Sequence, residues 1–393
     1  MDLFQKCHEY TEAREAIAAG YYPYFNPLSD TEGTEVTIRG HRLIMIGSNN
    51  YLGLTTHPKV RQAAIEAVQR YGTSCTGSRF LNGNLELHEE LERRLAHFIG
   101  KEAGLVFSTG FQTNLGTIAS LVGRNDVVIT DKEDHASIVD GCRLSFGTMK
   151  RFAHNDLLNL EQALRSCPEE AGKLVVVDGV FSMGGDLADL PGIVPLCRKH
   201  GARLMVDDAH SIGVLGGGRG TAVHFGLNDQ ADIIMGTFSK SFASLGGFIV
   251  GDEPVVHYVR HHARALIFSA SISPANTAAA MAALEVMETE PERGQRVLAI
   301  ADRMRREYQR MGYNTGNSVT PVIPIIIGER MRTFDMWRRL YQEGVYVNPV
   351  IEPAVPPGMS LLRTSYMATH TDEQMDRVLD AFHRVGKETG AIH

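Results

Sequence analysis

Short, uninterrupted apolar runs alternate with amphipathic segments through the middle of the chain. Strands that are buried on both faces read as continuous apolar runs, so this pattern predicts an α/β fold with a mostly parallel sheet and helices on both sides. Amphipathic segments between the runs, such as residues 134–146 and 190–201, predict the covering helices. The predicted strands are "GLVFS" (104–108), "DVVIT" (126–130), "KLVVVDGVF" (173–181), "ARLMVDD" (202–208), "ADIIMGTF" (231–238) and "GGFIVG" (246–251).

The pattern changes toward both ends of the chain. Residues 35–54, "EVTIRGHRLIMIGSNNYLGL", predict a short hairpin. From about residue 275 long helical patterns dominate, with short predicted strands at 321–327 and 345–350 and a final helix from Asp372. This mixture predicts a smaller α+β domain. The predicted division is an N-terminal segment (1–50), a large cofactor-binding domain (51–280) and a small C-terminal domain (281–393).

Composition and charge narrow the classes of protein that fit. The chain has 393 residues, with 43% hydrophobic and 22% charged residues, as expected for a globular protein with a sizeable core. Its net charge of −7 argues against a general nucleic-acid binder, which is usually basic. The 5 cysteines are scattered without a CxxC pair, and the N-terminus has no apolar signal core. We therefore expect reduced thiols and a cytoplasmic location.

The residues that follow the predicted strands carry most of the candidate chemistry. In an open parallel sheet, ligands bind at the carboxyl ends of the strands. In this chain those positions are rich in hydroxyl groups and small side chains, and they also hold one lysine, two histidines and a strand-end aspartate. They are residues 108–110, His135, Ser182, residues 207–210 and residues 237–240.

Lys240 follows a buried strand and is surrounded by hydroxyl-bearing residues. The ordinary interpretation of a lone lysine is a solvated surface residue. Here Thr237 and Ser239 offer hydroxyl and N–H groups of the kind that bind a phosphate, and "STGFQTN" (108–114) offers a second such group at a helix start. A phosphate site beside a strand-end lysine predicts pyridoxal 5'-phosphate, bound to Lys240 as a Schiff base.

Three further residues match what such a cofactor requires. Asp207 would keep the pyridine nitrogen protonated, His210 would contact the 3-oxygen of the ring, and His135 would face the ring. A metal site at Asp207, Asp208 and His210 is the alternative, but no further ligand cluster accompanies them, so we expect no metal. The sequence also lacks the glycine fingerprint of dinucleotide binding, a P-loop and the GxSxG of hydrolases.

Several motifs together resemble one enzyme family. "VDDAHSIGVLG" followed by "GTFSKSFASLGGF", with "DHASIVDG", "GVFSMGGDLADLP" and "SNNYLGL", resembles the α-oxoamine synthases, which are fold-type I pyridoxal phosphate enzymes. The resemblance extends from about Tyr24 to the final helix. "CTGSRFLNGNLELHEELE" and "PAVPPGMSLLRTSYMATHT" are most similar to bacterial members that condense L-serine with a long-chain acyl-CoA such as palmitoyl-CoA.

The resemblance implies a decarboxylative Claisen condensation. The products would be 3-ketodihydrosphingosine, CoA and CO2, and the reaction would begin sphingolipid synthesis. The alternatives are another α-oxoamine synthase that takes glycine, alanine or a related amino acid with a different acyl thioester, an aminotransferase or lyase of the same fold, and a catalytically inactive copy. An inactive copy would be expected to lack the lysine that is present here as Lys240.

The resemblance also implies roles for individual residues. Lys240 would hold the cofactor and move protons at Cα, and Arg363 would bind the carboxylate of the amino acid with help from Asn49. His135 would stack on the ring and orient the amino acid. The implied cofactor-binding residues are Gly110, Phe111, His135, Ser182, Asp207, His210, Thr237, Ser239, Lys240 and, reaching across from a partner subunit, Ser271.

The implied assembly is a homodimer with shared active sites. Outside the site, residues 260–268, "RHHARALIF", are locally basic. A solvated face is the ordinary interpretation of such a segment, and peripheral contact with a membrane or with a phosphate-rich donor is the alternative.

Overall fold

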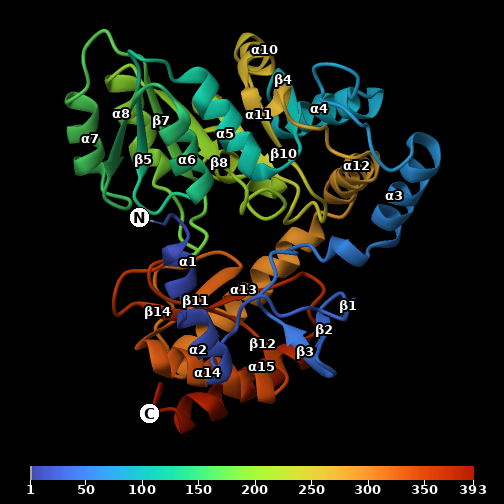
Figure 1. The fold of residues 1–393 in the computed structure, drawn as a ribbon, viewed down its shortest axis with the longest axis vertical. Helices are drawn as coiled ribbons and strands as arrows, with labels where there is room; N and C mark the ends of the chain where they lie inside the picture. The colour runs from blue at the N-terminus through green and yellow to red at the C-terminus, as the bar shows by residue number, and fades with distance from the viewer. Residues whose placement is uncertain (1) are drawn as a thin grey trace.

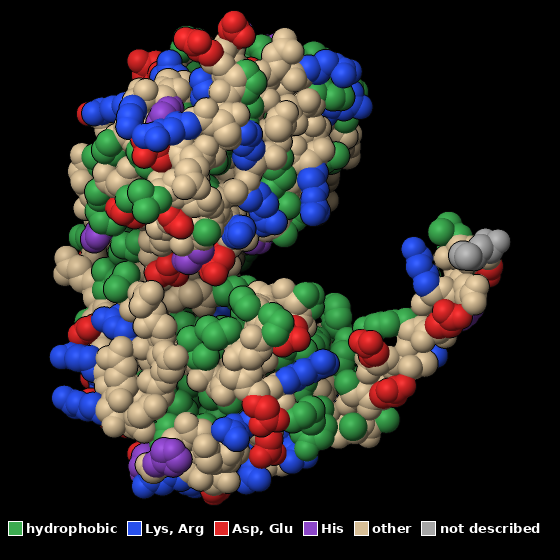
Figure 2. All heavy atoms as spheres, turned by 90° about the vertical axis from the view of Figure 1, so that its left-hand side faces the viewer, with side chains coloured by type: hydrophobic (Ala, Val, Ile, Leu, Met, Phe, Trp, Pro, Cys, Tyr) green, Lys and Arg blue, Asp and Glu red, His purple; other side chains and the backbone are tan. Residues whose placement is uncertain are grey.

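The structure, a computed structural model, describes residues 2–393 and has two lobes (Figure 1). The upper lobe (residues 58–289) contains the largest sheet, and the lower lobe (residues 21–57 and 290–393) brings together segments from both ends of the chain. Residues 2–20 form an N-terminal arm with helices α1 (Gln5–Glu9) and α2 (Glu12–Ala18). Figure 2 shows this arm projecting away from the body of the molecule.

The upper lobe is built on a 7-stranded sheet in the order β4-β10-β9-β8-β7-β5-β6. Strand β10 runs antiparallel to both of its neighbours, and the pairs from β9 to β6 are all parallel. The mostly parallel sheet predicted from the apolar runs is therefore confirmed. The strands are β4 (Ala103–Phe107), β5 (Val127–Asp131), β6 (Thr148–Phe152), β7 (Lys173–Asp178), β8 (Arg203–Asp207), β9 (Ile233–Thr237) and β10 (Gly247–Gly251).

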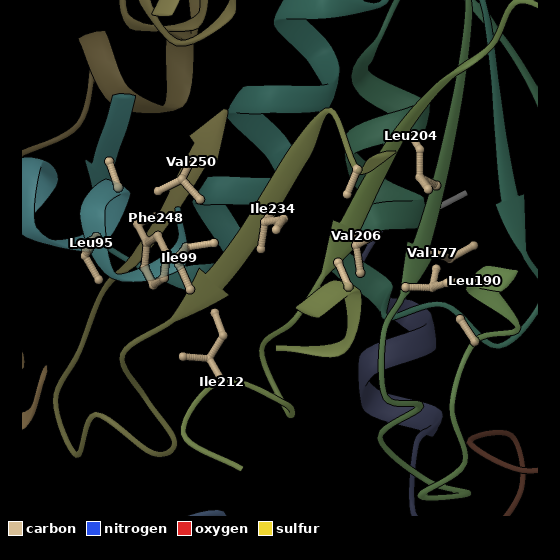
Figure 3. Packing of buried hydrophobic residues seen from close by; sticks show 14 of the residues in the cluster. Leu95, Ile99, Val177, Leu190, Leu204, Val206, Ile212, Ile234, Phe248 and Val250 are labelled. Atoms are coloured by element: carbon tan, nitrogen blue, oxygen red, sulfur yellow. The ribbon is translucent and has the colours of Figure 1, made fainter. Parts of the chain in front are cut away.

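Helices cover both faces of this sheet because successive strand residues point to opposite sides. In β7, for example, Val175 and Val177 pack into the cluster of Figure 3, whereas Leu174 and Val176 pack into the cluster on the other face. Helices on the first face are α3 (Pro58–Tyr71), α4 (Glu86–Ile99), α7 (Leu157–Arg165), α8 (Leu190–Lys199) and α12 (Pro274–Thr289). Helices on the other face are α5 (Gly110–Leu121), α6 (Ala136–Leu144), α10 (Glu253–His262) and α11 (Arg264–Ile267).

Short helical turns connect these elements. They are η1 (Leu54–Thr56), η2 (Gly216–Gly218), α9 (Thr221–His224) and η3 (Asn228–Gln230). Several helix starts are capped by the residue types that supply a side-chain acceptor for a free backbone N–H. Thr109 accepts from the N–H of Gln112 at the start of α5, and His135 accepts from the N–H of Ser137 at the start of α6. Both caps lie at carboxyl ends of sheet strands, so they fix residues of the candidate site.

The lower lobe combines two small sheets with three long helices. The predicted hairpin is present, and its second strand pairs in parallel with β12, so distant parts of the chain share one sheet. That sheet has the order β1-β2-β3-β12, and the other has the order β11-β14-β13. The strands are β1 (Asp30–Glu32), β2 (Glu35–Ile38), β3 (His41–Met45), β11 (Val322–Gly328), β12 (Val345–Tyr346), β13 (Asn348–Val350) and β14 (Ser360–Ser365). The helices are α13 (Glu292–Arg310), α14 (Arg330–Gln342) and α15 (Asp372–Glu388).

The final helix begins at Asp372 as predicted, where Thr371 and Gln374 form a reciprocal cap. Strand β14 was not predicted, because Arg363, Thr364 and Ser365 interrupt its apolar pattern. The division of the chain at residues 50 and 280 stays a prediction about independent folding units. No helix within residues 2–393 is long and apolar enough to cross a membrane.

Candidate active site

A cavity opens at the carboxyl ends of the parallel strands. Loops that follow β4, β5, β7, β8 and β9 all contribute to its wall, as the topology of an open sheet requires. The structure therefore brings nine predicted residues together in one place. They are Gly110, Phe111, His135, Ser182, Asp207, His210, Thr237, Ser239 and Lys240.

Lys240 lies in a tight turn between β9 and β10. The carbonyl of Lys240 accepts from the N–H of Ala243 at 3.0 Å, and the buried rings of Phe238 and Phe242 anchor the turn on the core. Burial lowers the pKa of Lys240 to about 8, although the nearby charges of Asp207 and Asp178 act in the opposite direction. The amine can therefore lose its proton near neutral pH, as a nucleophile or base must.

Asp207 ends β8 and is held by two donors. Its Oδ2 accepts from Asn114 Nδ2 at 2.7 Å, and its Oδ1 accepts from the backbone N–H of Ala209 at 3.0 Å. The side chain is 4% exposed. A buried carboxylate in a fixed orientation on the cavity wall suits a cationic ring nitrogen as its partner.

His210 lines the cavity and contacts Tyr51. The Tyr51 hydroxyl is 2.6 Å from His210 Nδ1, and burial raises the pKa of Tyr51 to about 12. Burial also holds the pKa of His210 well below its usual value, and the charges of Lys240 and Arg363 add to this effect. His210 is therefore neutral, and it can serve a ligand as a hydrogen-bond partner without carrying charge.

His135 lies at the mouth of the cavity, where its ring is accessible to solvent. Its backbone N–H donates to Asp178 Oδ2 at 3.0 Å, and its Nδ1 is 2.8 Å from Ser137 Oγ. Partial desolvation lowers the pKa of His135, whereas the charge of Asp207 raises it. The ring of Phe111 stands edge-on to it with the two centroids 6.3 Å apart.

The start of α5 and the end of β9 form an anion-binding corner. The N–H groups of Gly110 and Phe111 are in the first helical turn and have no acceptor within the helix. A Cβ atom on Gly110 would lie 2.6 Å from Thr237 Oγ1, so only glycine permits this close approach. The Thr237 hydroxyl is also 2.9 Å from Ser239 Oγ. Free N–H groups beside two hydroxyls fit a phosphate.

Arg363 reaches the cavity region from β14 in the lower lobe. It is 5% exposed, and its Nε donates to the carbonyl of Ser182 at 2.6 Å. Its Nη2 donates to Asn49 Oδ1 at 3.1 Å, which brings the two predicted carboxylate-binding residues into contact. A buried guanidinium has five N–H groups, so donors remain for a ligand carboxylate.

Ser271, like Asn49 and Arg363, does not line this cavity. Its Oγ donates to the carbonyl of Gly77 at 3.0 Å, and its backbone N–H donates to the same carbonyl. The predicted role of Ser271 toward a partner subunit stays a prediction.

Four residues that contact the predicted ones were not themselves predicted. Asn114 contacts Asp207, Tyr51 contacts His210, and both Asp178 and Ser137 contact His135. Asp178 ends β7 in the same way that Asp207 ends β8, so the strand-end rule itself could have identified it. Asn114 lies one helical turn after Gly110, which places both residues on one face of α5.

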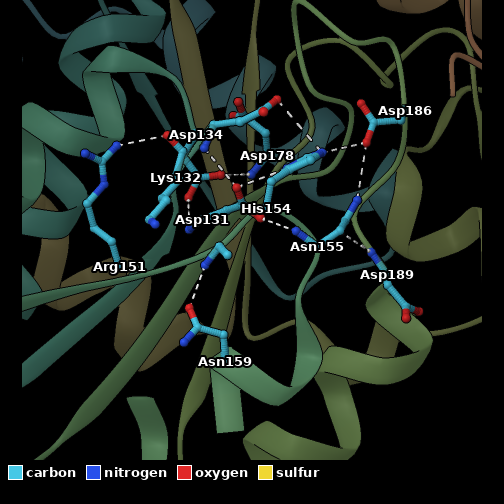
Figure 4. A network of polar contacts seen from close by, with 12 residues as sticks. Asp131, Lys132, Asp134, Arg151, His154, Asn155, Asn159, Asp178, Asp186 and Asp189 are labelled. Carbon is cyan, nitrogen blue, oxygen red and sulfur yellow. Dashed lines mark hydrogen bonds and ion pairs between the residues drawn. The ribbon is translucent and has the colours of Figure 1, made fainter. Parts of the chain in front are cut away.

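A polar network connects the end of β5 to the loop that carries Ser182 (Figure 4). His154 Nδ1 is 3.1 Å from Asp131 Oδ1, and its Nε2 is 2.9 Å from Asp186 Oδ2. Two carboxylates can only accept, so the ring carries both protons. Burial alone would lower the pKa of His154, but the hydrogen bonds to Asp131 and Asp186 raise it to about 10.

Replacing His154 with glutamine is expected to destabilise the protein in a pH-dependent way. A folded-state pKa near 10, against an ordinary value of 6.5, means that the stabilisation is complete below pH 6.5 and is lost as the pH rises through 10. Hydrogen bonds to charged groups contribute about 2 kcal/mol. We therefore expect a lower melting temperature for H154Q at pH 6.5, and a difference from the wild type that shrinks above pH 10. The exposed His383 gives the control H383Q; a difference that does not change with pH would contradict this assignment.

The chain is similar to known proteins over nearly its whole length. Residues 41–382 match the family model described as aminotransferase class I and II. A serine palmitoyltransferase of Sphingobacterium spiritivorum is 48% identical over 387 residues, which cover 98% of this chain and 97% of that protein. An 8-amino-7-oxononanoate synthase of Geobacter sulfurreducens is 42% identical and is covered to 98%. A solved structure described as SPT with its PLP internal aldimine superposes with a TM-score of 0.97 at 37% identity, with 100% of both chains covered.

Proposed function

The chain belongs to the α-oxoamine synthases within the aminotransferase class I and II family, and from this premise we propose that it condenses L-serine with palmitoyl-CoA. The products are 3-ketodihydrosphingosine, CoA and CO2, and the reaction starts sphingolipid synthesis. The observation that carries the proposal is the convergence of Lys240, Asp207, His135 and His210 on one cavity, with Arg363 beside it.

The cofactor is pyridoxal 5'-phosphate, and the residues present fit it. The free N–H groups of Gly110 and Phe111 and the hydroxyls of Thr237 and Ser239 would hold its phosphate. Asp207 would pair with the ring nitrogen, because its carboxylate is fixed by two donors on the cavity wall. The remaining contacts would come from His210 and Ser182 toward the 3-oxygen of the ring, from His135 on one ring face, and from Ser271 of a partner subunit.

When bound, pyridoxal phosphate supplies an electron sink for the negative charge that develops at Cα of an attached amino acid. Lys240 would hold the cofactor through Nζ until the amino acid displaces it, and the freed amine would then take and return the proton at Cα. Its lowered pKa of about 8 supports this role, since a base works best with a pKa near the working pH.

Arg363 binds the carboxylate of L-serine and thereby orients the bonds around Cα. Its Nε and one Nη2 hydrogen are already fixed by Ser182 and Asn49, so the guanidinium fork is held in one orientation before the substrate arrives. His135 donates a hydrogen bond to a negatively charged oxygen of the substrate as the new carbon–carbon bond forms.

A second cavity supports the placement of the acyl donor. It has a volume of about 850 Å³, and its lining includes the residues that flank His135 and Met183, the neighbour of Ser182. Glu133, Asp134, Asp140 and Glu352 also line this cavity, and Arg143 pairs with Asp140 at 3.4 Å. We therefore assign only Lys132 a contact with the phosphates of CoA. We propose that the long acyl chain lies in an apolar groove.

The assembly is proposed to be a homodimer with shared sites. Large apolar side chains are exposed where a second copy of the chain would cover them. Phe111 and Leu245 are at the cavity, and Phe80, Leu81 and Phe268 are exposed elsewhere. A monomeric mass in sedimentation equilibrium would contradict this proposal. A cytoplasmic location is supported by the five unpaired cysteine thiols.

The activity is tested by measuring thiol release from palmitoyl-CoA with purified, cofactor-loaded protein. Parallel reactions contain L-serine, glycine, L-alanine or no amino acid. We expect release with L-serine well above the other three. Release that is greatest with glycine or alanine would instead support the second candidate, another α-oxoamine synthase, which the 42% identity to an 8-amino-7-oxononanoate synthase favours. Release in none of the reactions would contradict both.

A further inference from the structure

The protonation state of His135 is determined by its position at the start of α6. Its Nδ1 is 3.2 Å from the backbone nitrogen of Ser137 and 2.8 Å from the hydroxyl of the same residue. A backbone N–H can only donate, so Nδ1 must accept and carries no proton. In the neutral ring the proton is then on Nε2. Among the described residues no protein group bonds to Nε2, so this N–H is available to the cavity.

The direction of the serine hydroxyl follows from Asn114. Asn114 Nδ2 is 2.7 Å from Asp207 Oδ2 and 2.8 Å from Ser137 Oγ. An amide oxygen in that position would face a carboxylate oxygen, so the amide presents its NH2 group to both. Ser137 Oγ accordingly accepts from Asn114, and its own hydrogen points to His135 Nδ1.

Asn114, Ser137 and His135 form a hydrogen-bond relay, and its surroundings keep it in one arrangement. Ser137 and Asn114 are each 1% exposed, so water cannot replace either partner. The amide oxygen of Asn114 has no partner within residues 2–393, so this side chain acts through its two N–H groups. A proton on Nδ1 of His135 would face the backbone N–H of Ser137, which cannot accept it, and this is unfavourable.

We propose that Ser137 and Asn114 are positioning residues that hold His135 as the neutral Nε2–H tautomer. His135 is then a hydrogen-bond donor toward the substrate and cannot act as a base through Nε2. The same asparagine holds Asp207, so the partner of the ring nitrogen and the donor at the cavity mouth are oriented together. The tautomer follows from the geometry alone, and its catalytic consequence rests on the proposed function.

Charged groups from three different elements lie around the ring of His135. Asp207 lies at the end of β8, Lys240 follows β9, and Asp178 at the end of β7 accepts from the backbone of His135. These groups are unchanged when Ser137 loses its hydroxyl. A change in the pH dependence of S137A therefore reports on the relay itself.

The direct test is nitrogen NMR of cofactor-loaded protein labelled with 15N-histidine. The His135 signals are assigned by their loss in H135Q. Between pH 6 and pH 8, about the range in which an ordinary histidine titrates, we expect an unprotonated Nδ1 and a protonated Nε2. A proton on Nδ1, or a doubly protonated ring, would overturn the proposal, and this measurement needs no substitution of Ser137 or Asn114.

The second test compares S137A with S137T, which keeps the hydroxyl. In S137A we expect kcat to fall roughly threefold to tenfold, as for loss of one hydrogen bond. The neutral ring of His135 loses the hydrogen bond from the Ser137 hydroxyl to Nδ1, so the pKa of His135 rises. The acidic limb of the kcat profile should therefore move upward by about half to one pH unit. S137T should restore both, and S120A, which removes a hydroxyl elsewhere, should change neither.

The two tests separate this inference from the proposed function. An unchanged acidic limb in an active S137A enzyme would overturn the relay and leave the reaction intact. The predicted tautomer in a protein that releases no thiol would support the relay and count against the reaction.

Discussion

Replacing Lys240 with alanine is expected to abolish the release of CoA from palmitoyl-CoA in the presence of L-serine. Lys240 Nζ is the group that would hold the cofactor and move the proton at Cα, and no other lysine lines the cavity among the described residues. Loss of a positioned base alone costs about 10²- to 10⁴-fold in rate. Because the variant loses two functions, we expect turnover below the detection limit.

The control for this variant is K387A, which removes an exposed lysine on α15. It should retain full activity. Borohydride reduction followed by peptide mass analysis should attach the cofactor to the peptide that contains Lys240 in the wild type, and not in K240A. Normal turnover by a folded K240A would contradict the assignment of this residue.

Replacing Arg363 with lysine is expected to weaken the binding of L-serine while leaving the protein folded. Lysine keeps the positive charge but cannot donate to Ser182, to Asn49 and to a substrate carboxylate in one plane, as the guanidinium does. Hydrogen bonds to charged groups are worth about 1.5–3 kcal/mol. We therefore expect the KM for L-serine to rise roughly 10- to 100-fold, with a much smaller change in the KM for palmitoyl-CoA.

Two comparisons keep this result interpretable. R93A removes an exposed arginine that pairs with Glu90 and should behave as the wild type. N49A should raise the KM for L-serine less than R363K does, because Asn49 only supports the guanidinium. An R363K enzyme whose KM rises equally for both substrates would show that Arg363 stabilises the lobe rather than binding the carboxylate.

Much of the site was predictable because strand ends obey a simple rule. Asp207, His135 and Lys240 follow apolar runs, and parallel strands bring their carboxyl ends together whatever lies between them. The rule needs only the position of each run, which the hydrophobic pattern provides. The same reasoning located the anion-binding corner at Gly110.

Other features depend on contacts that leave no local pattern. Tyr51 contacts His210 across 159 positions of the chain. Strand β3 pairs in parallel with β12, and no turn in the sequence connects these two strands. Strand β14 borders the site and therefore contains the polar residues Arg363, Thr364 and Ser365. These residues interrupt the apolar pattern from which a strand is predicted. Asn114 lies inside a helix rather than at a strand end, and only the relay to Ser137 and Asp207 gives it a role.

The most direct measurement follows both leaving groups of the condensation at once. Cofactor-loaded protein is incubated with palmitoyl-CoA and L-serine labelled in its carboxyl carbon, and labelled CO2 and free CoA are measured together. The proposed reaction predicts equal amounts of the two, each dependent on both substrates, with a 3-keto amine of the matching mass. Free CoA without labelled CO2, or labelled CO2 without palmitoyl-CoA, would contradict it.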